Sequence, residues 1–354
     1  MSVELLEDTT AVRKEKYGYT PLGQLDSYAC EGTQLPTDPW LKQTLKSQTL
    51  TYDALGNIAT STSVSTSGRK NVATYRYNAA DRTQLEGITH SDDKACPPVA
   101  LAYDSEGRLI SNSIANIGLV YNDAGRQVGV KAGKDSSTSY YDPYGRRTLS
   151  GFPYYYDLFY YRGDRVYARH GRDKVGDRAR DRHTVLLNES EACLLQESTF
   201  DYGSHGKNTT LTFELKDMQG TVVATCVSGE EKLDYLCYTP YGYRPSTPDD
   251  SSLQGFTGQV LDHHCGGVYH LGNGYRAYNP QLQCFQSPDT TSLSPFGQAG
   301  INNRLYCLGD PRNMVDPGGH LGVVIGERRE LTHAPLLDDP IAVSYTHLRA
   351  HETR

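Results

Sequence analysis

A short pattern of tyrosine, aspartate and glycine recurs along this chain of 354 residues. The clear copies are YDALGNIAT from Tyr52, YNAADRTQL from Tyr77, YDSEGRLIS from Tyr103, YNDAGRQVG from Tyr121 and YDPYGRRTL from Tyr141. They recur at roughly 18 to 26 residues, within the range of units that stack on one another. Looser copies begin at Tyr19, Leu215 and Tyr238. The repeat predicts a solenoid or a wound sheet in which each unit packs on its neighbours.

Each part of the pattern has a role in a hairpin turn. The Asp or Asn accepts backbone N–H groups two residues on, and the Gly takes a positive φ at no steric cost. We expect the Tyr to end the incoming strand and to lie against the Tyr of the next repeat. Asp81 stands at the glycine position of its copy, where a left-handed Asp is tolerable. The predicted turn residues are Asp53, Gly56, Asp104, Gly107, Gly125, Asp142 and Gly145.

Composition supports a mostly β chain and excludes several function classes. The 27 Tyr and 34 Gly, beside only 7 Phe and 1 Trp, suit short strands joined by tight turns. The net charge of −7 does not indicate a basic surface for binding nucleic acid or an anionic membrane. No apolar run approaches the roughly 20 residues of a membrane span, and no signal peptide is visible at the start. The eight cysteines form no CxxC pair, which favours unpaired, unactivated thiols in a reducing compartment.

Ordered motifs near the end of the chain add to the repeats. They are YTPYGYR (238–244), GFTGQ (255–259), LGNGYRAYNP (271–280), FQSPD (285–289) and NMVDPGGH (313–320). With the repeats, they resemble the RHS/YD-repeat family from about residue 15 to residue 320, including its RHS repeat-associated core. The resemblance implies hairpins that wind into a spiralling sheet, part of a hollow β-shell closed by that core. It also implies a polymorphic C-terminal toxin held inside, as in Tc-toxin C-components.

The resemblance divides the chain into four parts. Residues 1–160 are expected to hold the repeats, 161–214 an irregular β segment with a charged loop, and 215–320 the core. Within 160–187 we expect a strand pair with a turn at Gly163 and Asp164, then a solvated loop whose charges largely cancel. Residues 321–354 are a truncated tail, and 343–354 resemble a translated adapter sequence. The start within a repeat predicts a fragment of a longer protein.

The resemblance also implies a self-cleavage site. The motif from Asp316 to His320 would place a cut between His320 and Leu321, made by two aspartates of the aspartic-protease type. Asp289 matches the second aspartate. The chain departs from the family where Cys284 replaces an Arg, which removes a fixed positive charge, and where an insertion precedes SPFG (294–297). At most this is single-turnover autoproteolysis; the alternative is that Asp316 only caps a turn.

We expect no metal and no cofactor. His263, His264, Cys265 and His270 invite a zinc site, but adjacent histidines in a strand would point to opposite faces. The GNG at 272–274 is too short for a dinucleotide loop and predicts a tight hairpin turn.

The predicted function is therefore structural encapsulation of a C-terminal toxin, with release by self-cleavage after His320. The implied partners are the chain's own toxin segment, upstream shell repeats and a type VI or Tc-type secretion apparatus. No nucleic-acid partner is expected. The implied location is the bacterial cytoplasm before export, then outside the cell or in a target cell. The alternative is a cell-surface YD-repeat protein for adhesion or carbohydrate binding, with aromatic rows on its outer face.

Overall fold

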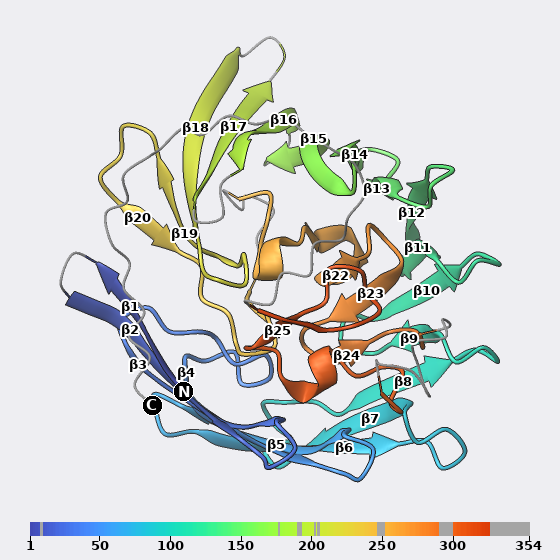
Figure 1. The fold of residues 1–354 in the computed structure, drawn as a ribbon. Coiled ribbons are helices and arrows are strands. Elements are labelled where there is room, and N and C mark those ends of the chain that lie inside the picture. The colour runs from blue at the N-terminus through green and yellow to red at the C-terminus, as the bar shows by residue number, and fades with distance from the viewer. Residues whose placement is uncertain are drawn as a thin grey trace.

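The computed structural model describes residues 1–7, 10–175, 178–189, 193–201, 203, 206–245, 252–289 and 300–325. Twenty strands form one antiparallel sheet in which each strand pairs with the next along the chain. The sheet curves around the later part of the chain (Figure 1). The prediction of a mostly β, shell-like fold is confirmed.

The strands of this curved sheet, called the wall below, have the following bounds. They are β1 (Ser2–Glu7), β2 (Thr10–Tyr19), β3 (Leu25–Gly32), β4 (Leu45–Tyr52), β5 (Ile58–Ser65), β6 (Lys70–Tyr77), β7 (Leu85–His90), β8 (Val99–Tyr103), β9 (Leu109–Asn112), β10 (Ile117–Tyr121), β11 (Gln127–Ala132), β12 (Asp135–Tyr141), β13 (Arg147–Phe152), β14 (Tyr155–Arg162), β15 (Arg165–Val175), β16 (Arg178–Glu189), β17 (Cys193–Asp201), β18 (Lys207–Lys216), β19 (Val222–Val227) and β20 (Leu233–Tyr235).

The described residues from 236 to 325, called the plug, lie within the curve of the wall (Figure 1). A small antiparallel sheet contains β21 (Leu261–Asp262), β22 (Val268–Leu271), β23 (Arg276–Asn279) and β24 (Cys284–Phe285). A separate hairpin pairs β25 (Met314–Val315) with β26 (Val323–Val324). Three 3-10 turns complete the plug: η2 (Phe256–Gly258), η3 (His263–Cys265) and η4 (Cys307–Gly309).

Alternating burial along the strands builds one core between the wall and the plug. In β4, Leu45, Gln48 and Leu50 are buried while Lys46 and Thr49 are exposed, as expected where one face of a sheet is covered. The core joins wall residues from β2 to β11 to the plug. Its largest fully buried side chains in the plug are Tyr241, Tyr269, Tyr278, Phe285 and Tyr306. The plug is therefore packed on the wall as part of a common interior.

The charged segment after residue 160 departs from its expected structure. The turn at Gly163 and Asp164 is confirmed, since β14 ends at Arg162 and β15 begins at Arg165. The expectation of a solvated loop is wrong, because β15 and β16 are long paired strands. Alternation places buried Arg169 and Arg182 on the inner face, where Asp157 compensates their charge. The sheet runs unbroken through the expected boundaries at 160 and 214.

Two further sequence expectations concern the whole chain. Within the described ranges, no helix is long and apolar enough to cross a membrane. The seven cysteines whose side chains are described are all free, as expected. The SPFG element (294–297) and the tail from 326 onward, with its adapter-like end, lie outside the described residues.

Candidate functional site

The predicted turn residues lie in hairpin turns of one repeated geometry. The Oδ1 atoms of Asp53, Asp104 and Asp142 each accept the backbone N–H groups two and four residues on, at 2.8–3.0 Å. The glycines close these turns in the left-handed region, with φ of 77° at Gly56, 76° at Gly107, 74° at Gly125 and 80° at Gly145. An L side chain at these positions would be strained.

The repeat tyrosines end their strands as expected, and Tyr103 lies close enough to Tyr77 and Tyr121 to influence the pKa of each. Their hydroxyls donate to the carbonyl that opens a neighbouring outgoing strand: Tyr77 to Ile58, Tyr103 to Leu85 and Tyr141 to Gln127. Beside three tyrosine rings lies the arginine of the preceding repeat. The guanidinium carbons lie 5.3 Å (Arg108–Tyr121), 5.5 Å (Arg126–Tyr141) and 5.1 Å (Arg146–Tyr161) from the ring centroids.

The Tyr77 copy breaks this series, and the plug compensates for it. Asp81 does not have the positive φ that was expected. Two extra residues let Asp81 open its own turn, in which its backbone carbonyl accepts the Gln84 N–H. No Gly-Arg pair follows, and Arg304 of the plug lies 5.1 Å from the Tyr103 ring instead. The plug therefore supplies an arginine that the repeat lacks.

The turns of the wall are also where the plug attaches. Asn302 donates to Asn57, Thr83 to Asn303 and Arg304 to the Gly107 carbonyl. Backbone bonds join Leu109 to Gln286 and Arg147 to Asn273. The repeated turns thus form the rim on which the plug rests.

The two predicted catalytic aspartates meet at one guanidinium inside the plug. Asp289 and Asp316 are 5% and 3% exposed. One terminal nitrogen of Arg276 lies 3.7 Å from Asp289 Oδ2 and 4.0 Å from Asp316 Oδ2. Other Arg276 nitrogens donate to the backbone carbonyls of Gly319 and, at 2.8 Å, Asn303. Segments far apart in sequence therefore converge around Arg276.

The residue before the expected cut is held by both aspartates. The His320 N–H donates to Asp316 Oδ1 at 2.9 Å, and its ring Nδ1 lies 3.2 Å from Asp289 Oδ1. The backbone N–H groups of Leu321 and Gly319 also interact with the Asp316 carboxyl. Burial raises the pKa of Asp316 against the opposing effect of Arg276 and these amides. The amide nitrogen of the His320–Leu321 bond thus lies against a carboxyl group whose pKa is raised.

Tyr275 and the hairpin at the end of the plug fix this geometry. The Tyr275 hydroxyl donates to Asp289 Oδ1 at 2.9 Å. The centroids of the Tyr275 and His320 rings lie 3.8 Å apart. The loop that carries the expected cut is spanned by β25 and β26, which pair Met314 with Val324. The expected cleavage point is therefore inside a closed hairpin loop.

Sequence reasoning missed Arg276, and it did not place Cys284 relative to the two aspartates. The Phe285 ring lies 3.7 Å from the Arg276 guanidinium carbon, and Cys284 points to the other face of β24, beside Arg304. Burial raises the pKa of the Cys284 thiol to about 12. The fixed positive charge at the aspartates comes from Arg276. The only signal was the arginine in LGNGYRAYNP, whose GNG forms the predicted hairpin turn between β22 and β23.

The histidine-rich segment has a different conformation from the expected strand. His263, His264 and Cys265 form the 3-10 turn η3. Cys265 and His270 instead gather with Asp262, all three buried, in an arrangement that offers three ligand atoms. Arg147 donates to the same Asp262 carboxylate, and with burial it lowers the pKa of His270 to about 4. The positive charge of this guanidinium would repel a metal ion at the same carboxylate, so the cluster is organised as a buried ion pair.

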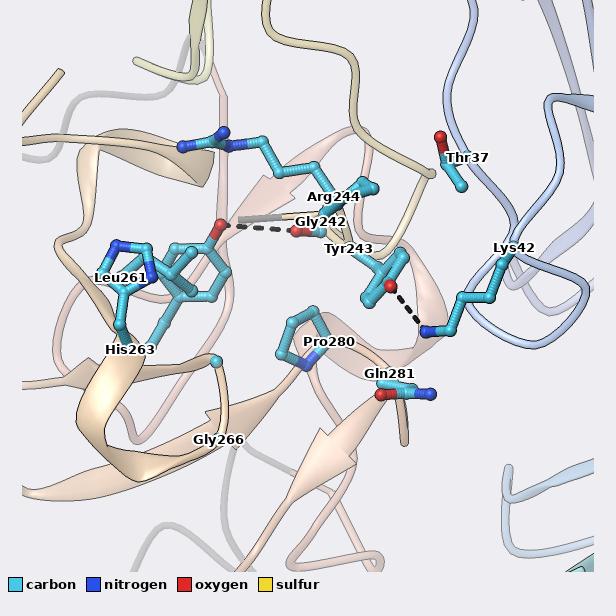
Figure 2. Close-up of a pocket in the computed structure, with 13 residues that line it drawn as sticks. Thr37, Lys42, Gly242, Tyr243, Arg244, Leu261, His263, Gly266, Pro280 and Gln281 are labelled. Atoms are coloured by element: carbon cyan, nitrogen blue, oxygen red, sulfur yellow. Dashed lines mark hydrogen bonds between the residues drawn. The ribbon is translucent and has the colours of Figure 1, made fainter. Parts of the chain in front are cut away.

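A cavity of about 640 Å³ lies at a junction between wall and plug (Figure 2). Lys42 of the wall donates to the Tyr243 hydroxyl at 2.9 Å on one side. Leu261, His263 and Pro280 line it on the plug side. Neither Asp289 nor Asp316 is among its lining residues, so it is separate from the aspartate site.

Comparison with known proteins supports the fold. No family model matches the chain, and no curated protein matches it. The solved structure of TcdB2-TccC3-Cdc42 is similar to this chain, with a TM-score of 0.59 and 18% sequence identity. The structure of TcdB2-TccC3 without its hypervariable C-terminal region is also similar, with a TM-score of 0.55 and 17% identity. Each match covers 88% of this chain but only 17% of the other. The chain therefore has the fold of a stretch of these much longer Tc toxin chains.

Proposed function

We propose that this chain is a wall-and-plug section of a toxin-encapsulating shell, and that its plug cuts the chain once between His320 and Leu321. The observation that carries the proposal is the convergence of Asp289 and Asp316 on Arg276 and on the backbone of His320. The curved wall and its likeness to Tc toxin chains support the encapsulating role. Further wall strands, the segment after residue 320 and a toxin-delivery complex would be its partners.

The cleavage step needs one base and one acid. Asp289 takes a proton from a water molecule whose oxygen attacks the His320 carbonyl carbon. The C–N bond then breaks, and Asp316 gives its proton to the Leu321 nitrogen. The products are a carboxyl group at His320 and an amine at Leu321. Solvent reaches this loop, since the His320 side chain is 31% exposed.

The assignment of the two roles follows from the contacts of each carboxyl group. Asp316 interacts with the Leu321 N–H and has a raised pKa, which suits a proton donor to the leaving nitrogen. Asp289 accepts from Tyr275 and lies near Arg276, contacts that favour its ionised form. Arg276 and Tyr275 are positioning residues for the pair.

The variants Asp289→Asn and Asp316→Asn test this proposal in the full chain by intact mass. Each should abolish the species that ends at His320, because each removes either the base or the acid. Asp310→Asn is the matched control, since Asp310 caps a turn of the same plug by accepting from Asn313. It should be cut like the wild type. Equal cutting in all four proteins would contradict the assignment.

The pH dependence separates the two roles. Cutting requires protonated Asp316, so the rate should fall as pH rises through its raised pKa. A rate that rises steadily with pH across that range would exclude Asp316 as the proton donor. Arg276→Gln should slow cutting and change this profile, which a purely structural loss would not do.

A further inference from the structure

Two histidines face each other across β15 and β16. These strands are neighbours in the wall (Figure 1). His170 pairs directly with His183, and their Nδ1 atoms lie 3.0 Å apart. The rings meet edge to face, with centroids 4.3 Å apart. The flanking pair of Arg169 and Thr184 is buried, so alternation places both histidines on the opposite, outer face. His183 is exposed and His170 is partly exposed.

We propose that His170 and His183 form a binding site for a divalent transition metal ion, with Cu²⁺ the best fit. Imidazole nitrogens bind such ions at about 2.0–2.1 Å. Two nitrogens 3.0 Å apart then subtend an angle of about 95° at the metal. That is close to the right angle of square-planar or octahedral coordination and below the tetrahedral angle of about 109°. Cu²⁺ and Ni²⁺ prefer this geometry, and Cu²⁺ stands highest in the affinity order.

Two aspartates lie near the pair, and each is paired with a basic side chain. Asp181 lies two residues before His183 on the same face of β16, and Asp201 lies opposite Asp181 on β17. Asp181 pairs with Arg172 at 3.7 Å, and Asp201 pairs with Lys207 at 2.9 Å. The four residues form a row across β15 to β18, with Arg172 and Lys207 at its ends. Water would complete the coordination sphere.

The test is titration of the untagged full chain with CuCl₂, followed by calorimetry and electron paramagnetic resonance. The wild type should bind one Cu²⁺ at this site with two nitrogen ligands. His170→Gln and His183→Gln should each weaken this binding by about tenfold or more, because loss of even an outer partner of a metal ligand has that effect. Each variant should leave a signal with one nitrogen fewer. Both positions are on the surface, so far-UV circular dichroism should show intact folding.

His90→Gln is the control, because His90 is also a partly exposed strand histidine, whose Nδ1 is 3.0 Å from the Asn71 amide. It should bind Cu²⁺ like the wild type. Absence of binding by the folded wild type would overturn the proposal. Equal affinity and an equal nitrogen count in the His170 and His183 variants would also overturn it, since any bound metal would then lie elsewhere. In that case the pair is a cross-strand hydrogen bond only.

Discussion

The wall between β4 and β11 differs from the wall between β14 and β18 in what its inner face carries. The first region presents Leu50, Ile58, Leu85, Ile88 and Leu109 to the core shared with the plug. The second presents Arg169, Arg182, Thr184, Gln196 and Glu214, all buried. Both are antiparallel strands of one sheet, so backbone pairing does not distinguish them.

The difference lies in the turns. The first region has the Tyr-Asp-Gly turns, whose ends bind plug residues such as Asn302 and Arg304. In the sequence, no copy of the Tyr-Asp-Gly pattern joins β15 to β16, β16 to β17 or β17 to β18. The small apolar cluster described there holds Leu186 and Leu253, with Val166 and Val260 packed against it. The Tyr-Asp-Gly turns are therefore points at which the wall supports the plug. Four comparisons between matched positions test this conclusion.

The largest effect is expected from truncation of the apolar inner face. Leu109→Ala removes a fully buried side chain beneath the plug, which should lower the free energy of unfolding by about 2–5 kcal/mol. Leu187→Ala on β16 changes a side chain that is 51% exposed and should cost less than about 0.5 kcal/mol. Urea unfolding measures both. Similar losses would show that the two regions contribute alike.

In the polar region the expected effect depends on pH. Burial raises the pKa of Glu214 from 4.5 to about 7, against the smaller opposing effects of the Ser252 hydroxyl and the Leu253 backbone. The native state then binds the proton more tightly, so wild-type stability should fall between pH 4.5 and 7, by up to about 3 kcal/mol. Glu214→Gln should match the wild type near pH 4.5 and be more stable at pH 8. The same difference at both pH values in urea unfolding would refute this.

The attachment of the plug to the rim can be compared with a contact inside the wall. Arg304→Ala removes a buried guanidinium that binds the Gly107 carbonyl and lies over Tyr103, with an expected loss of about 2 kcal/mol. Arg126→Ala removes only a stacking contact on Tyr141 and should cost about 1 kcal/mol or less. Thermal unfolding ranks the two variants. An equal or reversed order would mean that the plug arginine does not replace the missing repeat arginine.

The smallest effect concerns two tyrosines of the same series. The Tyr141 hydroxyl donates to the Gln127 carbonyl at 2.7 Å, whereas the Tyr121 hydroxyl is buried without a hydrogen-bond partner in the described part of the chain. Tyr141→Phe should therefore cost about 1 kcal/mol, and Tyr121→Phe should be neutral or slightly stabilising. Urea midpoints resolve this difference. A clear loss in Tyr121→Phe would reveal a partner for that hydroxyl.

The sequence predicted the parts of the fold that depend on local chemistry. The Asp and Gly of each turn specify backbone geometry within a few residues, so the wall could be predicted from them. The meeting of Asp289 with Asp316 was predicted by resemblance alone, because no local pattern links these positions. Arg276 was missed, since its role depends on which strand of the plug lies between the two aspartates. The continuation of β15 and the strand β16 were missed because their alternating charges look solvated until the inner face supplies Asp157 as a partner.

The most direct test of the central claim combines size-exclusion chromatography under native conditions with denaturing intact mass of the purified wild-type chain. The account predicts a single folded peak containing two pieces, one that ends at His320 and one that begins at Leu321. They should co-elute, because Val323 and Val324 remain paired with β25 and the Ile325 N–H donates to Asn313. A folded peak that contains only the uncut chain would contradict the account, and Asp316 would then serve its turn alone.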